Sequence, residues 1–159
     1  LEKLVEKREV LTVGIEGMKT APLYMLSKYK NKKIGLSADT FILSPFDVLN
    51  TYRHRLREFF DFHYQVELAV PEGKRKYGFF ACPVLMGDTF IARMDSKADR
   101  KQKILTINNL HFEPGKLTGR AIDKISKAIK AFAKFNQCKE INIIKCKNKS
   151  ALKIIRDAL

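Results

Sequence analysis

Residues 77–95, YGFFACPVLMGDTFIARMD, decide the fold of this chain. Two runs rich in aromatic and aliphatic residues, at 77–85 and 89–95, flank the tripeptide Met86-Gly87-Asp88. Strand-forming runs joined by a short turn that contains glycine predict an antiparallel β-hairpin. The stretch therefore predicts an antiparallel sheet built around this hairpin.

Further runs on both sides extend the predicted sheet. The segments HYQVELAV (63–70) and KILTINNLHFE (103–113) have strand-forming composition, and FIL (41–43) predicts a short buried strand. The link that starts at Pro71 is basic, and the link after residue 95 is SKADRKQ. Antiparallel neighbours with short links are typical of a meander that curls into a barrel.

The first forty residues predict a different module. LEKLVEKRE (1–9) has helical spacing, and β-prone runs at 10–15 and 21–26 predict a hairpin. A helix followed by a hairpin is how a winged-helix module ends, although many α+β folds contain the same pair. Lys19, at the hairpin tip, could reach a phosphate. The polar, basic stretch 27–40 is expected to be a connector.

The motif LSPFD (43–47) raises a choice between capping and catalysis. Ser44 fits the N-cap of a helix, and Pro45 fits the first helical position, where its missing N–H costs nothing. Asp47 would then be the third helical residue, where a carboxylate meets the positive end of the helix dipole. We therefore expect a capping role for Ser44 and Asp47, in a helix that runs to about Phe60.

Arginines on this helix have a less settled role. Arg53 and Arg57 are four residues apart and share one face, whereas Arg55 points elsewhere. A solvated face, carboxylate partners and contacts to a DNA backbone are all open for them. The block RMDSKADRK (93–101) is similarly open between a salt-bridged turn and a phosphate-contacting loop.

The C-terminal third changes to helical periodicity. Ile122, Ile125 and Ile129 lie on one face of a helix predicted within 119–137. EINIIKC (140–146) predicts a buried strand, and Asn148 or Ser150 can cap a last helix. The predicted class is α+β: the end of a winged helix-turn-helix module, then an antiparallel β-barrel-like sheet with C-terminal helices. The expected division is 1–40 (winged-helix end and connector), 41–62 (linking strand and helix) and 63–159 (β-barrel-like domain).

The charge of the chain indicates a polyanionic partner. Its 159 residues carry 31 Lys and Arg against 17 Asp and Glu, a net charge of +14. Residues 101–159 alone hold 14 basic and 4 acidic residues, so most of the excess lies in the last third. Such asymmetry indicates nucleic acid, with a solvated basic surface as the alternative.

Motifs for other chemistry are missing from the sequence. Cys82, Cys138 and Cys146 form no C-x-x-C pair and are expected to be reduced, buried thiols. The three histidines have no metal-ligand spacing, and no nucleotide-binding loop or G-x-S-x-G motif occurs. No apolar run approaches the length of a membrane span. We therefore expect a soluble, cytoplasmic protein without metal or cofactor.

A family resemblance adds to this. Residues 43–101 resemble the C-terminal half of the winged-helix crosslink-repair DNA glycosylases, the YcaQ-like family. The matching pieces are SPFD (44–47), FHYQVE (62–67), KRKYG (74–78), KADR (97–100), Arg53, Arg55, Pro71, Pro83, Gly87, Asp88, Arg93 and Asp95.

The resemblance implies a function in DNA repair. Full chains of that family carry tandem winged-helix motifs followed by a β-barrel domain, which together form a basic, concave surface for duplex DNA. They hydrolyse the N-glycosidic bond of alkylated purines, notably N7-alkylguanines, and unhook interstrand crosslinks. A Q-x-Q or Q-x-D motif helps to position water and to stabilise an oxocarbenium-like sugar, and a hairpin in the barrel helps to engage the lesion.

The chain departs from that pattern at the catalytic motif. Gln65, Gln102 and Gln137 are its only glutamines, and none forms Q-x-Q or Q-x-D. We therefore expect the C-terminal portion of a longer protein, and assign no catalytic residue and no metal ligand. The resemblance gives a DNA-facing role to the hairpin tip at 85–88 and to the 93–100 block, although Met86 brings no donor or charge to the tip.

The expected partner is double-stranded DNA, bound by a monomer. The candidate DNA-contacting residues are Lys19, Arg53, Arg55, Arg57, Lys74, Arg75, Lys76, Arg93, Lys97, Arg100, Lys124 and Lys127. Three functions stay open: the DNA-holding part of a repair glycosylase, a non-catalytic DNA-binding or regulatory protein, and an interaction module with a basic surface.

Overall fold

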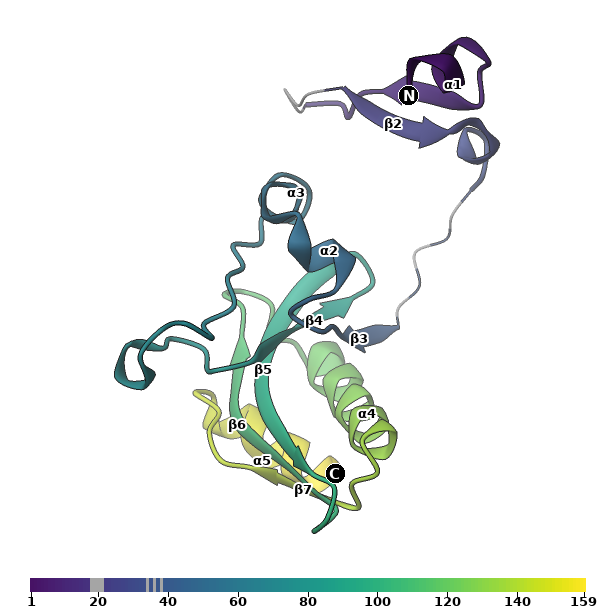
Figure 1. Cartoon of the computed structure of the whole chain (residues 1–159). Coiled ribbons are helices and arrows are strands. Elements are labelled where there is room, and N and C mark those ends of the chain that lie inside the picture. Colours follow the sequence, from purple (N-terminus) through teal and green to yellow (C-terminus); the bar gives the residue numbers. More distant parts are fainter. Residues whose placement is uncertain (18–21, 34, 36, 38) are drawn as a thin grey trace. The chain divides into compact units, whose positions relative to one another are not determined.

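A computed structural model describes residues 1–17, 22–33, 35, 37 and 39–159. The chain forms two compact units, Leu1–Leu36 and Ser37–Leu159, and each is described by itself. Figure 1 shows the elements of both units.

The N-terminal unit contains a helix and a hairpin. Helix α1 (Glu2–Glu6) precedes strands β1 (Val10–Val13) and β2 (Leu23–Leu26), which pair antiparallel with Val13 opposite Leu23. A 3-10 turn follows at Ser27–Tyr29. The predicted hairpin is therefore confirmed, with shorter strands. The winged-helix assignment stays a prediction, and Lys19 lies outside the described residues.

The second unit is built on a curled sheet in the order β3-β4-β5-β6-β7. Strands β3 to β6 are antiparallel, and β4, β5 and β6 are three of the four strands of the predicted meander, whereas β7 pairs parallel to β6. The parallel pairing follows from the crossover through helix α4 (Gly119–Phe135), which returns the chain to the same end of the sheet. The strands are β3 (Thr40–Ile42), β4 (Ala81–Met86), β5 (Thr89–Asp99), β6 (Ile104–Phe112) and β7 (Glu140–Ile143).

The hairpin predicted at 77–95 is confirmed as β4 and β5. Met86 pairs with Thr89 across a two-residue turn, in which Gly87 has a φ of +62° that glycine adopts without strain. The backbone N–H of Gly87 donates to the carbonyl of Asp39 at 3.0 Å, so the chain entering β3 packs against the hairpin tip. The first strand starts at Ala81, four residues later than predicted.

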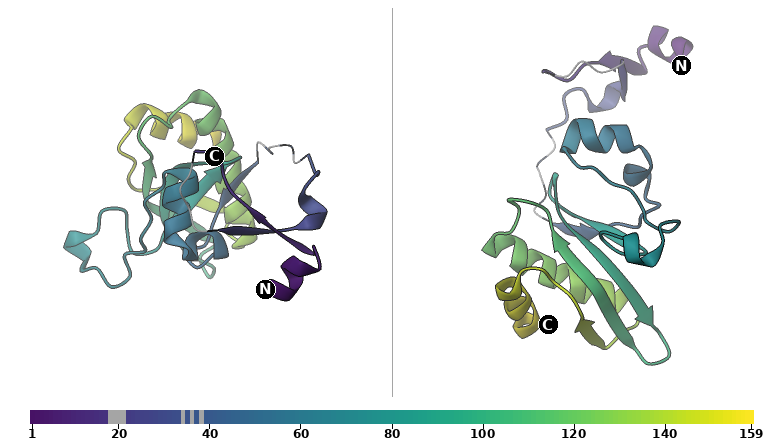
Figure 2. Two further views of the ribbon diagram at one scale, coloured as in Figure 1. Left: turned by 90° about the horizontal axis from the view of Figure 1, so that it is seen from above. Right: turned by 90° about the vertical axis from the view of Figure 1, so that its left-hand side faces the viewer.

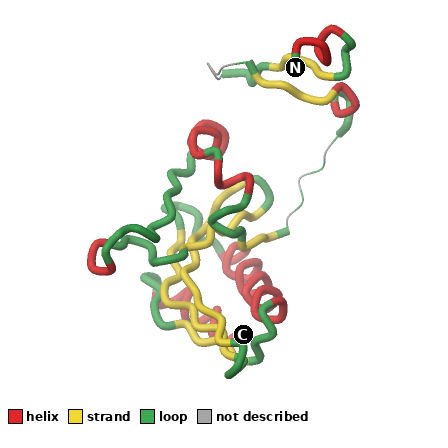
Figure 3. Tube along the Cα trace, in the orientation of Figure 1, coloured by secondary structure: helices red, strands yellow, loops and turns green. Residues whose placement is uncertain are grey.

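The strand predicted at 63–70 is wrong. Residues 63–80, which we call the arm, link α3 to β4 without joining the sheet, and contain only a 3-10 turn at Glu72–Lys74 (Figure 3). The alternation of apolar and polar residues is real, because Phe62 and Tyr64 are buried and His63 and Gln65 are exposed. In place of strand pairing, side chains form hydrogen bonds with several backbone groups of the arm, as described below.

The helix start predicted at Ser44 is also displaced. Asp47 is the N-cap of α2 (Val48–Thr51) and accepts the backbone N–H of Leu49 at 2.9 Å. Ser44 instead accepts the N–H of Phe46 within the preceding turn. Tyr52 separates α2 from a second helix, α3 (Arg53–Phe60), so the predicted single helix is two. The capping role expected for this motif is confirmed, with Asp47 in place of Ser44.

Two hydrophobic clusters hold the second unit together. The larger packs the amphipathic helices α4 and α5 (Lys149–Ala158) on the sheet, around Ile107, Ile125 and Ile155. The smaller joins α3 and the start of the arm to β5. Figure 2 shows α4 and α5 on one side of the sheet and α3 toward the other. Asn148 caps α5 by accepting the N–H of Ala151 at 2.8 Å, as one of the two predicted alternatives.

The three cysteines are free and buried, as predicted. Burial, with a smaller contribution from the charge of Asp95, raises the pKa of the Cys82 thiol from 9.0 to about 12. Because the thiolate is the reactive form, burial disfavours reaction at Cys82. Within the described ranges, no helix combines the length and apolar character that a membrane span needs.

Gly78 provides a test of how the arm meets the sheet. Its φ is +136°, and a Cβ at this position would overlap the side chain of Asp95, so we expect Gly78→Ala to destabilise the chain by about 3 kcal/mol. Gly119→Ala is the matched control, because nothing lies within 4 Å of its Cβ position, and should change stability by less than about 0.5 kcal/mol. Urea denaturation measures both, and equal stabilities would contradict the close approach.

Candidate nucleic-acid interface

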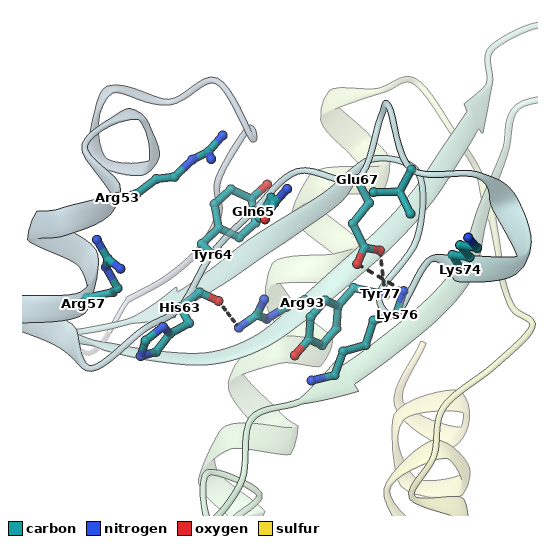
Figure 4. A pocket seen from close by; sticks show the side chains of 11 residues that line it. Arg53, Arg57, His63, Tyr64, Gln65, Glu67, Lys74, Lys76, Tyr77 and Arg93 are labelled. Atoms are coloured by element: carbon teal, nitrogen blue, oxygen red, sulfur yellow. Dashed lines mark hydrogen bonds between the residues drawn. The ribbon is translucent and has the colours of Figure 1, made fainter.

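A basic pocket lies between α3, the arm and β5. Its volume is about 590 Å³. Figure 4 shows side chains from these elements around it. We call it the basic pocket and define it by its five cationic lining residues, Arg53, Arg57, Lys74, Lys76 and Arg93.

Helix α3 supplies one wall. Leu56 is fully buried in the smaller cluster, so the helix is fixed by that face and Arg53 and Arg57 remain exposed on another. Their i, i+4 spacing places both beside the pocket, as their shared face predicted. In the part of the chain that the structure describes, neither forms an ion pair with a carboxylate.

The beginning of the arm supplies the floor beside α3. The Tyr64 hydroxyl donates to the carbonyl of Ala81 at 2.8 Å, and its ring stacks on Phe62 with centroids 5.9 Å apart. Burial, then the neighbouring Cys82, raises the pKa of Tyr64 above its ordinary value. Tyr64 is therefore an anchor that turns the intervening His63 and the following Gln65 toward the pocket.

Arg93 is the buried base of the pocket. It is only 4% exposed, and its Nε donates to Glu113 Oε1 at 2.6 Å while Nη2 donates to the carbonyl of His63 at 2.8 Å. Its guanidinium lies 4.4 Å from the ring centroid of Phe62 and 4.0 Å from that of Tyr77. These contacts pair its charge with Glu113 and place its guanidinium over two aromatic rings. The structure therefore favours a supporting role for Arg93 over the direct DNA contact predicted from sequence.

Glu67 links two parts of the arm by hydrogen bonds. Its carboxylate accepts backbone N–H groups from Lys76, Tyr77 and Gly78 at 3.1, 2.9 and 3.0 Å. Partial burial raises its pKa, but these three hydrogen bonds outweigh that effect and hold the pKa of Glu67 below its usual value. The bonds fix the part of the arm that carries Lys74 and Lys76, both exposed at the pocket.

Arg75 also braces the arm instead of lining the pocket. Its Nε donates to the carbonyl of Val70 at 2.8 Å, and its guanidinium lies 4.9 Å from the ring centroid of Phe79. Arg55 likewise lies over a ring, that of Tyr52, at 4.9 Å. These two arginines of the predicted set are therefore not among the lining residues.

The remaining candidates lie away from the pocket. Lys97 is exposed near the end of β5, and Arg100 follows in the turn to β6. Lys124 and Lys127 lie on α4, where Lys127 pairs with Asp123 at 3.0 Å. A DNA-contacting role for these residues stays a prediction.

Several lining residues were not singled out from sequence. Gln65, His63 and Tyr77 line the pocket, although sequence reasoning gave them no place there. The alternation of apolar and polar residues at 62–65 was the one local pattern that could have indicated that His63 and Gln65 face away from the core. Nothing in the sequence pairs Glu67 with the N–H groups nine to eleven residues later. Among the described residues, no three His, Cys, Asp or Glu side chains are grouped to hold a metal ion.

The buried pair can be tested by a double-mutant cycle. Arg93→Met leaves Glu113 without its partner in a site where only 14% of that side chain is exposed, and we expect a loss of about 3 kcal/mol. Adding Glu113→Leu to Arg93→Met should recover part of the lost stability. The single variant Arg93→Lys should also be less stable than the parent chain, because an ammonium lacks the planar fork of a guanidinium. The exposed Arg100→Met is the control. A single variant as stable as the parent chain would contradict the structural role.

Glu67 gives a pH-dependent prediction. Its folded-state pKa is lowered, so the stability that it contributes is present above about pH 4.5 and is lost as pH falls through the lower folded-state value. Glu67→Gln should therefore be less stable than the parent chain at pH 7, with a difference that shrinks below pH 4. Thermal unfolding across this range measures the difference, with the exposed Glu72→Gln as control. A pH-independent difference would show that the charge of Glu67 is not involved.

Comparison with known proteins identifies the family of the chain. No solved structure matches the chain. The family model described as DNA glycosylase AlkZ-like matches residues 1–135, which include α1, the sheet through β6, the arm and α4. This match confirms the resemblance found in residues 43–101 and extends it over most of the sequence. The chain belongs to the AlkZ-like DNA glycosylase family.

Proposed function

We propose that this chain is the DNA-holding C-terminal part of a monofunctional DNA glycosylase that excises N7-alkylguanine and unhooks interstrand crosslinks. Its family places it in DNA repair and gives it DNA as a binding partner. The observation that supports the holding role is the gathering of Arg53, Arg57, Lys74 and Lys76 around one pocket. The winged-helix end in residues 1–40 is a further part of the proposal.

The proposed reaction needs no metal. Alkylation at N7 leaves the purine cationic, so the base departs readily when its N-glycosidic bond breaks, and water then attacks the sugar. Residues 1–159 contain no Q-x-Q or Q-x-D motif. We therefore assign binding and orientation of the DNA to this chain, and water activation to a motif that precedes it in the whole protein.

The cations away from the pocket extend the proposed DNA surface. Lys97 and Arg100 on β5 and its turn, the exposed Lys127 and the half-buried Lys124 on α4 would add contacts to phosphates. Such contacts position a protein on DNA without reading its sequence. Arg55 and Arg75, which lie over aromatic rings, keep donors that could join them. A monomer acting in the cytoplasm stays a prediction.

The test is an assay of base release. We expect the 159-residue chain to release no free base from a duplex that carries N7-methylguanine, and the full-length parent protein to release it. Mass spectrometry of the released base gives the readout, with the unalkylated duplex as control. Release by the chain alone would place the active site within these residues. No release by the parent would instead favour a non-catalytic DNA-binding protein.

A further inference from the structure

We propose that the basic pocket binds phosphodiester groups of the DNA backbone and excludes the alkylated base. This inference rests on the proposed function, in which DNA is the ligand, and it names the part of the DNA that this pocket takes. It assigns direct contacts to Arg53, Arg57, Lys74 and Lys76 and a supporting role to Arg93.

The charge of the lining favours an anion. Five cationic side chains line the pocket, and Glu67 is the single carboxylate among its described lining residues. That carboxylate accepts three backbone N–H groups of the arm. The charge of Arg93 is balanced by its ion pair with Glu113. The charges of Arg53, Arg57, Lys74 and Lys76 are therefore left for a ligand.

The two tyrosine rings of the pocket already contact other side chains of the protein. The Tyr64 ring is 6% exposed and stacks on Phe62. The Tyr77 ring has the Arg93 guanidinium at 4.0 Å and the Lys76 ammonium at 4.9 Å from its centroid. Proteins that hold an unstacked base place it against a free aromatic face or an arginine plane. Neither tyrosine of this pocket therefore offers a free ring face of that kind.

The charge of the lesion gives an independent argument. N7-alkylguanine is cationic, and bringing it among like charges is unfavourable by Coulomb's law. A phosphodiester has the opposite sign and is attracted by the same side chains. The pocket therefore discriminates by charge between the two parts of the damaged strand.

The rigid frame of the pocket suits this task. Glu67, Arg75 and Arg93 fix the arm through side-chain bonds to its backbone. Lys74 and Lys76 are long, exposed side chains on that arm, and Arg53 and Arg57 are exposed on α3 beside it. A fixed frame with adaptable cations can follow a sugar-phosphate backbone whatever its sequence, which is how phosphate contacts act.

Salt-dependent binding tests the proposal with the complete 159-residue chain. The affinity for a 20-bp duplex is measured by fluorescence anisotropy between about 50 and 200 mM salt, with and without one N7-methylguanine. Arg57→Gln combined with Lys76→Gln should reduce the slope of log K against log salt by about 1.8, because each lost phosphate contact removes about 0.9. The loss should be the same for both duplexes. The exposed Lys153→Gln on α5 is the control and should leave the slope unchanged.

Two results would overturn the proposal. An unchanged slope in the double variant would show that the pocket does not hold phosphate, and a loss confined to the alkylated duplex would show that it holds the base. Lysine acetylation of the unmutated chain provides a second readout that needs no variant. Duplex DNA should protect Lys74 and Lys76 and leave Lys153 reactive, and equal reactivity with and without DNA would contradict the assignment. Base release by the parent is a separate result, so failure of the glycosylase proposal is distinguishable from failure of this one.

Discussion

The buried guanidinium of Arg93 is the interaction on which the pocket depends. A charge removed from water is costly unless it is paired and hydrogen-bonded, and here the partners are Glu113 and the carbonyl of His63. Because Glu113 follows directly after β6, the pair also fixes the β5–β6 register, in which Arg93 lies opposite His111. A slip of one residue would turn the alternating side chains to the other face and leave Arg93 unpaired. One buried cation thus couples the sheet register to the position of the arm.

The conformation of the arm follows from that coupling and from two carboxylates. Asp95, two residues after Arg93 in β5, accepts the N–H of Phe80 at 2.9 Å and meets Gly78, where a side chain would not fit. Glu67 binds the backbone just before that point. The arm is therefore held at both of its ends by the sheet, and its middle by its own side chains. A loop held in this way can carry exposed lysines at fixed positions without belonging to the ladder.

Local patterns in the sequence predicted the turn, the helix face and the helix cap that depend on residues close together in the chain. The turn at Gly87, the apolar stripe of α4 and the cap at Asn148 each lie within a few residues of what they determine, and the structure confirms them. The arm was taken for a strand because Phe62 and Tyr64 alternate as they would in one. Its true partners are distant in sequence: His63 meets Arg93 thirty residues later, a pairing that no local pattern contains. The same distance explains why the sequence did not predict Glu113 as the partner of Arg93, since Glu113 lies twenty residues beyond it.

The proposed reaction requires charges of opposite sign for binding the DNA phosphates and for breaking the glycosidic bond. A site that stabilises departure of a cationic base and an oxocarbenium-like sugar needs neutral or negative groups close to the sugar, whereas a site that holds phosphates needs cations. At about 4 Å, two like unit charges repel by ~1 kcal/mol in water and by ~4 kcal/mol at the effective dielectric constant near a protein surface. A single pocket would therefore serve one of these tasks at the expense of the other. The basic pocket has the charge for holding, and residues 1–159 lack the paired glutamine motif for hydrolysis. Both features support the proposal that this chain holds the phosphates of the strand beside the lesion.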